Sequence, residues 1–285
     1  MSNLTQRIVV ALALLPFVLW AFVAGGWALR GLLMATALVC FWEYGNVTVR
    51  TDKVARAALL VVGSGATVHA LAAANDAFAT LLVFNLAVIA LGSLYVLRPG
   101  ELPTAWPRLA LLGFGVMYIG LGLWAVARLR DLGDTLDGAA RAGPILAAFT
   151  ATWANDTCAY FAGRFLGKHK MAPLISPKKT WEGFAGGALG SLAFLFTGRA
   201  LFPDVFAFFT AVDLVCIALP TAFLGPMGDL AESMWKRGFD TKDSGAILPG
   251  HGGMLDRIDA VLFVVPWSLF YLGSLKPALD RLLSG

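Results

Sequence analysis

One glycine-rich segment, residues 233–259, concentrates polar and charged side chains in a chain that is 58% hydrophobic and only 14% charged. It reads SMWKRGFDTKDSGAILPGHGGMLDRID, and its five glycines allow the backbone to approach a ligand closely. Its carboxylates could hold divalent cations, and its lysines and arginines could bind phosphates. The side chains concerned are Lys236, Arg237, Lys242, Asp243, His251, Asp256, Arg257 and Asp259. We therefore predict a site for metal ions and phosphates in this segment.

A polar stripe leads into the segment. In GPMGDLAESMWKRGFD, a short helix that begins after Pro226 would place four polar side chains on one face: Asp229, Glu232, Ser233 and Lys236. Such a stripe can be an ordinary solvated surface, but here a glycine-rich loop follows it directly. Asp229 and Asp256 supply the hard oxygen ligands that Mg²⁺ uses when it also binds substrate phosphates.

A second group of polar residues lies in TATWANDTCAYFAGRFLGKHK, where Asn155 and Asp156 interrupt an apolar helix. An acid at the centre of a membrane span costs about 2.5–3.5 kcal/mol, so it normally faces a partner or water. Asp156 and Tyr160 share one helix face, which leads towards Arg164 at the end of the helix. A purely structural role, in which Asn155 and Asp156 hydrogen-bond a neighbouring helix, is the alternative.

A third group is ISPKKTWEG, residues 175–183, which would open the next helix with Ser176 as its N-cap and Pro177 in its first position. Lys178 and Lys179 would then lie in the first turn, where the helix dipole disfavours cations and favours anions. We expect a phosphate at this helix N-terminus. The alternative is that the two lysines reflect only the bias of Lys and Arg towards cytoplasmic loops.

These groups must be positioned by membrane helices. The mean hydropathy is +0.74, and apolar runs of about 20 residues, the length of a membrane-spanning helix, recur along the chain. We predict an all-α, polytopic integral membrane protein with about nine transmembrane helices and a polar active site on the cytoplasmic side. The predicted spans are 8–29, 31–46, 57–74, 78–97, 108–128, 144–165, 182–199, 205–225 and 258–275. We expect a single membrane domain, 1–285, with N-terminal packing helices over 1–130 and catalytic helices and cytoplasmic loops over 144–275.

The distribution of Lys and Arg predicts the orientation. With a cytoplasmic N-terminus, 15 of the 22 Lys and Arg residues fall on the inner side, together with the polar loops. The net charge of +4 is modest and suits a protein that meets lipid headgroups and soluble anions at the surface of a bilayer. The chain has no basic run that would suggest nucleic acid as a partner.

At these residues the chain resembles the phosphatidate cytidylyltransferases, the CDP-diacylglycerol synthases of phospholipid biosynthesis. The resemblance is strong over 150–260 and extends to the N-terminal part only in the pattern of spans. It includes NDTCAYFAGRFLGKHK, SPKKTWEG and a signature matched by Ser233, Lys236, Arg237, Lys242, Asp243, Pro249, His251, Gly252, Gly253, Asp256, Arg257 and Asp259. The resemblance implies a nine-span membrane enzyme in which Asp229 and Asp256 bind catalytic cations.

The implied reaction joins CTP and phosphatidic acid to give CDP-diacylglycerol and pyrophosphate. Because the second pKa of a phosphate monoester lies near 6, the lipid phosphate is mostly ionised at neutral pH and needs no general base. We therefore expect Mg²⁺ at Asp229 and Asp256, with Asp156 and Asp259 as weaker ligand candidates and the identity of any second cation left open. The predicted catalytic residues are Asp229, Asp256, Lys236, Arg237, Lys242 and Asp243. The predicted substrate-binding residues are Ser176, Lys178, Lys179, Asn155, Asp156, Tyr160, Arg164, Ser233, His251, Gly252, Gly253 and Arg257.

Two other functions are weighed against this one. A CTP-dependent polyprenol or phytol kinase would transfer the γ-phosphate and release CDP instead of pyrophosphate. A transporter would also bury acids, but it more often shows matching repeats in its two halves, which this sequence lacks. By resemblance we expect a multi-pass protein of the cell inner (plasma) membrane with cytoplasmic N-terminus and active-site loops, and we leave a homodimer open.

Overall fold

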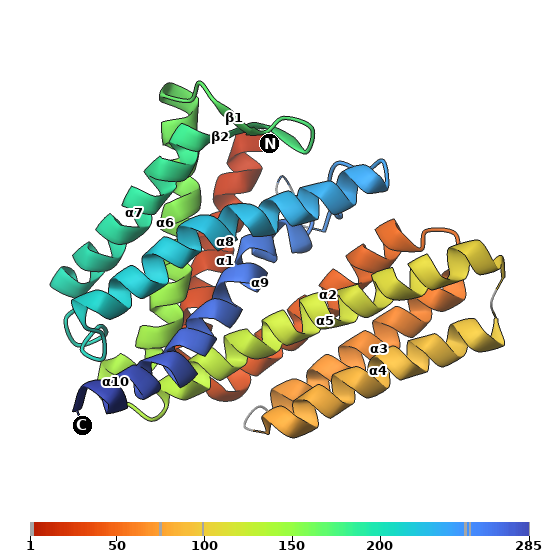
Figure 1. Ribbon diagram of the computed structural model, residues 1–285, viewed down its shortest axis with the longest axis horizontal. Coiled ribbons are helices and arrows are strands. Elements are labelled where there is room, and N and C mark those ends of the chain that lie inside the picture. The colour runs from red at the N-terminus through yellow and green to blue at the C-terminus, as the bar shows by residue number, and fades with distance from the viewer. Residues whose placement is uncertain (1–2, 74–75, 99, 248–249, 251, 285) are drawn as a thin grey trace. The chain divides into compact units, whose positions relative to one another are not determined.

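The chain is mainly helical in the computed structural model, which describes residues 3–73, 76–98, 100–247, 250 and 252–284 (Figure 1). It divides into two compact units, each described here by itself. Unit 1 comprises Met1–Ala127 and Gly238–Arg257. Unit 2 comprises Arg128–Arg237 and Ile258–Gly285. The single membrane domain expected from the sequence stays a prediction.

The helices of unit 1 follow one another along the N-terminal part of the chain. They are α1 (Asn3–Ala24), α2 (Gly26–Thr48), α3 (Lys53–Ala72), α4 (Ala77–Leu97) and α5 (Leu102–Gly133), whose last residues belong to unit 2. The break between α1 and α2 lies at Gly25 and Gly26, whose φ angles of 62° and 49° suit glycine best. Asp52 caps α3, because its carboxylate accepts hydrogen bonds from the backbone N–H groups of Val54 and Ala55.

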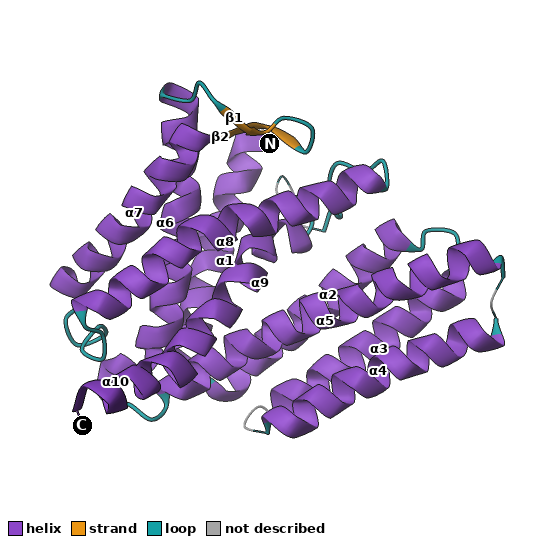
Figure 2. Cartoon of the chain, viewed as in Figure 1, coloured by secondary structure: helices purple, strands orange, loops and turns teal. Residues whose placement is uncertain are grey.

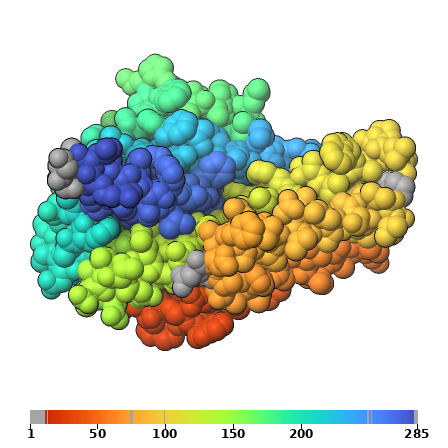
Figure 3. Space-filling model, turned by 60° about the horizontal axis from the view of Figure 1, so that its bottom comes forward, coloured from red at the N-terminus to blue at the C-terminus, as the bar shows by residue number. Residues whose placement is uncertain are grey.

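Helices α3 and α4 pack side by side, and Figure 3 shows their orange and yellow side chains as adjoining surfaces. Glycines on α5 make room for aromatic rings from its neighbours in unit 1. A β-carbon at Gly115 would lie 2.5 Å from the Tyr44 ring of α2, and one at Gly120 would overlap the Phe84 ring of α4. The Tyr44 hydroxyl also donates a hydrogen bond to the Leu111 carbonyl at 2.9 Å. The aromatic core of unit 1 therefore depends on small residues in α5.

Unit 2 contains the remaining helices and a short hairpin. Its elements are a 3₁₀ helix η1 (Gly138–Ala142), α6 (Gly143–Phe165), β1 (Lys170–Ala172), β2 (Ser176–Thr180), α7 (Trp181–Leu201), α8 (Ala211–Gly238), α9 (Leu255–Phe270), a π-helix η2 (Tyr271–Leu275) and α10 (Lys276–Ser284). The first residues of α9 belong to unit 1. The hairpin is antiparallel and pairs Lys170 with Thr180 and Ala172 with Ser176 (Figure 2).

Helices α6 and α7 pack closely because α7 presents glycines to α6. A β-carbon at Gly190 would lie 2.5 Å from Cys158, and one at Gly186 would overlap the Ala162 side chain. The Ser191 hydroxyl also donates to the Ala151 carbonyl at 2.9 Å. Small residues that allow helices to approach closely are typical of packing in membranes.

A buried polar cluster lies at the start of α8. The Asp213 carboxylate, 2% exposed, accepts hydrogen bonds from the Tyr271 hydroxyl and the Lys276 ammonium group, both at 2.8 Å. It also accepts from the backbone N–H and the hydroxyl of Thr210, which precedes the helix. The cluster therefore connects α8 to the π-helix and to α10.

The prediction of an all-α, multi-pass membrane protein is confirmed. Among the described residues, six helical segments are long and apolar enough to cross a membrane by length and composition: Lys53–Ala72, Ala77–Leu97, Leu102–Gly133, Trp181–Leu201, Ala211–Gly238 and Leu255–Leu282. Of the other three predicted spans, 31–46 lies within α2 and 144–165 within α6, whereas 8–29 runs across the break at Gly25 from α1 into α2.

The short helix expected after Pro226 is wrong. Helix α8 begins at Ala211 and continues through Pro220 and Pro226 to Gly238, so Asp229 lies in the interior of a long helix. Proline is tolerated inside membrane helices because neighbouring groups satisfy the carbonyls that it leaves without a donor.

Candidate active site

A strand and a helix of unit 2 bring Lys179 and Asp229 together. The Lys179 Nζ atom on β2 lies 2.9 Å from the Asp229 Oδ2 atom on α8, and it also donates to the Pro226 carbonyl at 3.1 Å. The Ser233 hydroxyl, one turn further along α8, donates to the other carboxylate oxygen of Asp229 at 3.2 Å. Both members of the ion pair are only partly buried, so the pair remains accessible to a polar ligand.

The predicted helix N-terminus at Ser176 is wrong, because residues Ser176–Thr180 form the strand β2. Helix α7 begins at Trp181, and its N-cap is Thr180, whose hydroxyl accepts from the Gly183 N–H at 3.1 Å. Pairing with β1 satisfies backbone groups of 176–180 that a helix would otherwise use. The two lysines therefore do not lie in a first helical turn.

The strand instead separates the two lysines. Successive side chains of a strand point to opposite faces, so Lys178 is exposed while Lys179 turns towards α8. A phosphate site that uses Lys179 would thus be built from a strand side chain and not from the α7 dipole.

The start of α7 is tied to the linker that follows α6. The Glu182 carboxylate accepts from the backbone N–H groups of Lys168 and His169, and it lies 2.6 Å from the His169 Nδ1 atom. Neither Glu182 nor His169 was selected from the sequence. An acid in the first turn of a helix, a favoured position, was the available signal.

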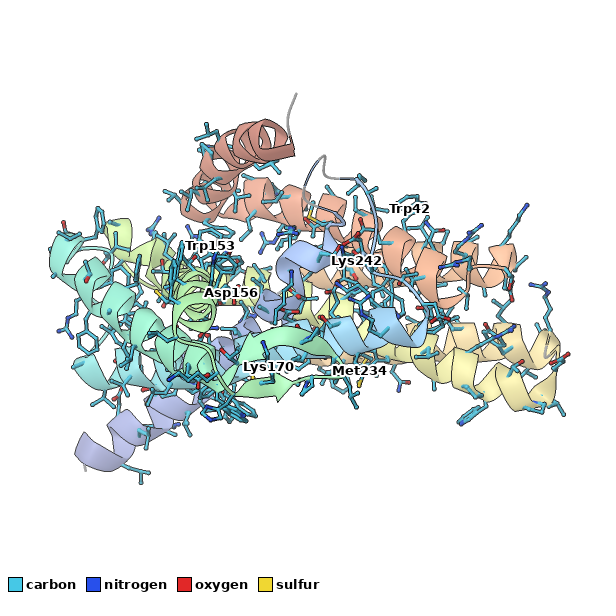
Figure 4. All side chains as sticks on the ribbon, turned by 90° about the horizontal axis from the view of Figure 1, so that it is seen from above. Trp42, Trp153, Asp156, Lys170, Met234 and Lys242 are labelled. Atoms are coloured by element: carbon cyan, nitrogen blue, oxygen red, sulfur yellow. The ribbon has the colours of Figure 1, made fainter. Side chains whose placement is uncertain are left out.

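Two acids from other helices of unit 2 interact electrostatically with this ion pair. The charges of Asp156 on α6 and Asp259 on α9 both interact with Asp229, and Asp156 also interacts with Lys179. Figure 4 labels Asp156 on α6 and Lys170 on the hairpin. Carboxylate oxygens are suitable Mg²⁺ ligands, so the chemistry of this acid group fits a hard cation. Within the part of the chain that the structure describes, no three His, Cys, Asp or Glu side chains are close enough to hold a metal ion.

The other predicted residues of α6 have different surroundings. Asn155 is fully buried, and its amide packs against two glycines: a β-carbon at Gly187 on α7 would overlap its Oδ1 atom, and one at Gly225 on α8 would lie 3.2 Å from its Nδ2 atom. The Arg164 guanidinium donates to the Tyr160 hydroxyl at 2.8 Å on an exposed part of the helix. Asn155 therefore packs in the interior, whereas Tyr160 and Arg164 lie on the surface.

Near the end of α8, Lys236 forms a buried ion pair with Glu232. Their side-chain atoms are 2.6 Å apart, and the two residues are 9% and 3% exposed. The expected polar stripe is thus divided: Glu232 and Lys236 are buried, and Asp229 and Ser233 are partly exposed. Arg237, the next residue, is exposed.

In unit 1, the carboxylate of Asp256 holds together the two ends of the glycine-rich loop. It accepts from the backbone N–H of Ser244 at 3.1 Å and from that of Gly253 at 2.8 Å. Gly252 has a φ angle of 81°, and a β-carbon there would lie 3.0 Å from Asp256 Oδ2 and 3.9 Å from Asp243 Oδ1. The loop therefore brings the carboxylates of Asp243 and Asp256 near each other, and a side chain at position 252 would crowd them.

The remaining predicted residues of this segment are on the surface or outside the described residues. Lys242, labelled in Figure 4, and Arg257 are exposed. Pro249 and His251 lie outside the described residues. Asp256 belongs to unit 1 and Asp229 to unit 2, so a metal site shared by these two carboxylates stays a prediction.

Sequence analysis missed Glu43, a fully buried acid on α2. Its carboxylate accepts hydrogen bonds from the Ser244 hydroxyl and from the backbone N–H groups of Met254 and Leu255. The signal that could have found it is a lone acid within an apolar run, which normally has a specific partner.

The chain matches one family model, and the similar proteins described here share one name. The family model described as "Cytidylyltransferase family" matches residues 5–275. A phosphatidate cytidylyltransferase of Brucella melitensis is 32% identical over 283 residues, which cover 95% of this chain and 93% of that relative. Two others, from Staphylococcus haemolyticus and Staphylococcus aureus, are 43% and 41% identical over 156 residues, which cover 53% of this chain. The matched part spans about half the length, 54%, of these two relatives.

Proposed function

Because this chain belongs to the cytidylyltransferase family, we propose that it transfers the cytidylyl group of CTP to phosphatidic acid. The products are CDP-diacylglycerol and pyrophosphate. The observation that carries the proposal is the similarity over 95% of the chain to a relative named phosphatidate cytidylyltransferase. A match of this extent includes the helices of both units as well as the polar segments.

The chemistry requires cations more than a base. An oxygen of the lipid phosphate attacks the α-phosphorus of CTP, a new P–O–P bond forms, and the bond between the α- and β-phosphates breaks to release pyrophosphate. The lipid phosphate is already mostly ionised at neutral pH. The main barrier is the repulsion between two anionic substrates, which positively charged groups reduce.

Lys179 is the best supported of the phosphate-binding side chains. It is held in place by the Asp229 carboxylate and the Pro226 carbonyl, and it keeps partial exposure. Its position on a strand beside α8 suits it to bind a phosphate oxygen while its partner carboxylate remains near. The other phosphate-binding candidates are Lys178, Lys236, Arg237, Lys242 and Arg257, of which Lys236 is paired with Glu232.

Asp229 and Asp256 are the proposed ligands of Mg²⁺, with Asp156 and Asp259 as further ligands in unit 2. When bound, Mg²⁺ would neutralise charge on the CTP phosphates and on the leaving pyrophosphate. Lys179 and Ser233 orient the Asp229 carboxylate through its two oxygens. Ser244 and Gly253 orient the Asp256 carboxylate in the same way. A second cation is part of the proposal.

The proposed setting is the bacterial inner membrane, with the N-terminus and the polar loops on the cytoplasmic side, where CTP is present. The excess of Lys and Arg in the corresponding loops supports this orientation. The homodimer stays a prediction, to be checked by measuring the mass of the solubilised protein.

Two labels on CTP test the reaction directly. Membranes that contain this protein receive phosphatidic acid, Mg²⁺ and CTP labelled either at the α- or at the γ-phosphorus. We expect the α-label in a chloroform-soluble product and the γ-label in pyrophosphate. Transfer of the γ-label to lipid, with release of CDP, would instead identify a CTP-dependent lipid kinase. Ion flux in proteoliposomes without any nucleotide product would identify a transporter.

A further inference from the structure

Glu43 lies in the interior of unit 1, where an acid is costly unless it is paired. It is 0% exposed, and its neighbours on α2, among them Phe41 and Tyr44, are also buried. A buried carboxylate needs hydrogen-bond donors to compensate for the loss of water. Its donors come from the glycine-rich loop, more than 200 residues further along the chain.

Glu43 binds both ends of that loop. One oxygen accepts from the Ser244 hydroxyl at 3.2 Å and from the Leu255 N–H at 3.0 Å, and the other accepts from the Met254 N–H at 3.0 Å. Leu255 is the first residue of α9, so Glu43 caps this helix from another helix. A negative charge at a helix N-terminus is also favoured by the helix dipole.

The loop is shaped to fit this carboxylate. A β-carbon at Gly245 would overlap the Glu43 side chain, and one at Gly253 would lie 2.7 Å from Glu43 Oε2. Glycine at both positions therefore allows the backbone to close around the acid. Gly245 directly follows Ser244, and Gly253 is itself one of the two residues whose N–H groups hold Asp256.

Ser244 connects Glu43 to Asp256. Its hydroxyl donates to Glu43, and its backbone N–H donates to Asp256. Gly253, the other donor to Asp256, is followed directly by Met254, a donor to Glu43. A shift of the Glu43 carboxylate would thus move both backbone groups that fix the direction of Asp256.

We propose that Glu43 is a positioning residue for the active site, which sets the orientation of the Asp256 carboxylate, and of nearby Asp243, towards the cation and the substrate phosphates. This inference rests on the proposed function, in which Asp256 binds the cation. Glu43 itself does not touch the substrate. Residues that orient metal ligands typically change metal affinity or activity by about 10- to 100-fold when mutated.

The first test compares Glu43→Gln with Glu101→Gln, an exposed acid of unit 1, in the purified full-length protein. Glutamine keeps the shape but replaces one acceptor oxygen with an NH₂ group, which would oppose the N–H donors of the loop. We expect Glu43→Gln to lower kcat by about 10- to 100-fold and to raise the Mg²⁺ concentration for half-maximal activity about tenfold, with partial rescue by excess Mg²⁺. Glu101→Gln should change neither quantity. An unchanged Mg²⁺ midpoint in Glu43→Gln would overturn the proposal.

A milder variant decides the question if Glu43→Gln fails to fold. Ser244→Ala removes only the hydroxyl contact and keeps the N–H that donates to Asp256. We expect it to fold with a Tm only slightly below that of the wild type and to raise the Mg²⁺ midpoint by about two- to fivefold, in line with the loss of one hydrogen bond. A midpoint equal to that of the wild type would overturn the proposal.

Amide hydrogen exchange provides a readout that does not depend on activity. Without Mg²⁺ and CTP, the peptide that contains Met254 and Leu255 should exchange about tenfold faster in Glu43→Gln than in the wild type. Unchanged exchange would show that Glu43 does not hold the loop. If the wild-type protein releases no pyrophosphate from CTP and phosphatidic acid, the proposed function fails, whereas the exchange experiment still decides whether Glu43 holds the loop.

Discussion

The ammonium group of Lys179 lies 2.9 Å from the Asp229 carboxylate, so a strand and a membrane helix contribute opposite charges to one point of unit 2. The interacting charges of Asp156 and Asp259 make the surroundings of this pair acidic. A site with one cation among several carboxylates suits ligands that bring both a divalent metal and phosphate groups. Folding of unit 2 thus brings together Lys179 and Asp229, which lie 50 residues apart in the sequence.

Lys179 should matter more to catalysis than its neighbour Lys178. Lys179→Ala removes the charge held beside Asp229, and we expect kcat/KM for CTP to fall by about 10²- to 10³-fold, the range for loss of one charge-stabilising group. Lys178→Ala should lose clearly less, because its side chain lies on the other face of the strand. Initial rates of pyrophosphate release measure both variants. Equal losses would contradict the assignment of Lys179 as the main phosphate ligand of the strand.

Asp229→Asn should abolish activity that Mg²⁺ supports. The change removes the negative charge but keeps the shape, so we expect a loss of about 10³-fold or more with the helices intact. A titration of Mg²⁺ against pyrophosphate release, with circular dichroism as a check on folding, measures the effect. Asp204→Asn, in an exposed turn of unit 2, is the matched control and should behave like the wild type. Normal activity of Asp229→Asn would remove this residue from the proposed metal ligands.

Lys276→Met should destabilise the protein without a direct effect on chemistry. The Lys276 ammonium group is 2.8 Å from the buried Asp213 carboxylate, so its removal leaves that charge with fewer partners. Breaking a buried ion pair on one side costs about 3–5 kcal/mol. Thermal unfolding in detergent should show a clear fall in Tm, whereas Lys170→Met on the exposed hairpin should melt like the wild type. If both variants melt together, the cluster does not stabilise unit 2.

Gly190→Ala and Gly65→Ala should have opposite effects on stability. A β-carbon at Gly190 would meet Cys158 at 2.5 Å, and overpacking of this kind costs about 1–3 kcal/mol. A β-carbon at Gly65, in the interior of α3, has no neighbour within 4 Å, so alanine there should stabilise the helix by about 0.5–1 kcal/mol. Thermal unfolding of the two variants under identical conditions measures the difference. A stabilising Gly190→Ala would mean that α6 and α7 pack less closely than described.

The helices were predictable because long apolar runs leave few alternatives in a membrane. Each predicted span overlaps a helix, but 8–29 runs across the break at Gly25, and α8 begins later and ends well beyond the predicted 205–225. Sequence rules treat proline as a helix boundary, whereas packing within unit 2 accommodates Pro220 and Pro226.

The candidate site was predictable in residue type but not in arrangement. Ser176 followed by Pro177 has the pattern of a helix start, but Thr180 offers a second N-cap and the strand pairs with β1. Glu43 could not be linked to the glycine-rich segment, because their contact depends on tertiary structure and leaves no local pattern. The pairing of Lys179 with Asp229 was missed for the same reason.

The separation of Glu43 from Ser244 by 201 residues has a consequence for biogenesis. The ribosome completes α2 long before it synthesises the loop that supplies the donors, so Glu43 is first made without them. A lone carboxylate in apolar surroundings is unfavourable, and the early helices gain their full stability only when residues 244–255 emerge. A nascent chain that stops short of this loop therefore keeps the Glu43 carboxylate without the donors of Ser244, Met254 and Leu255.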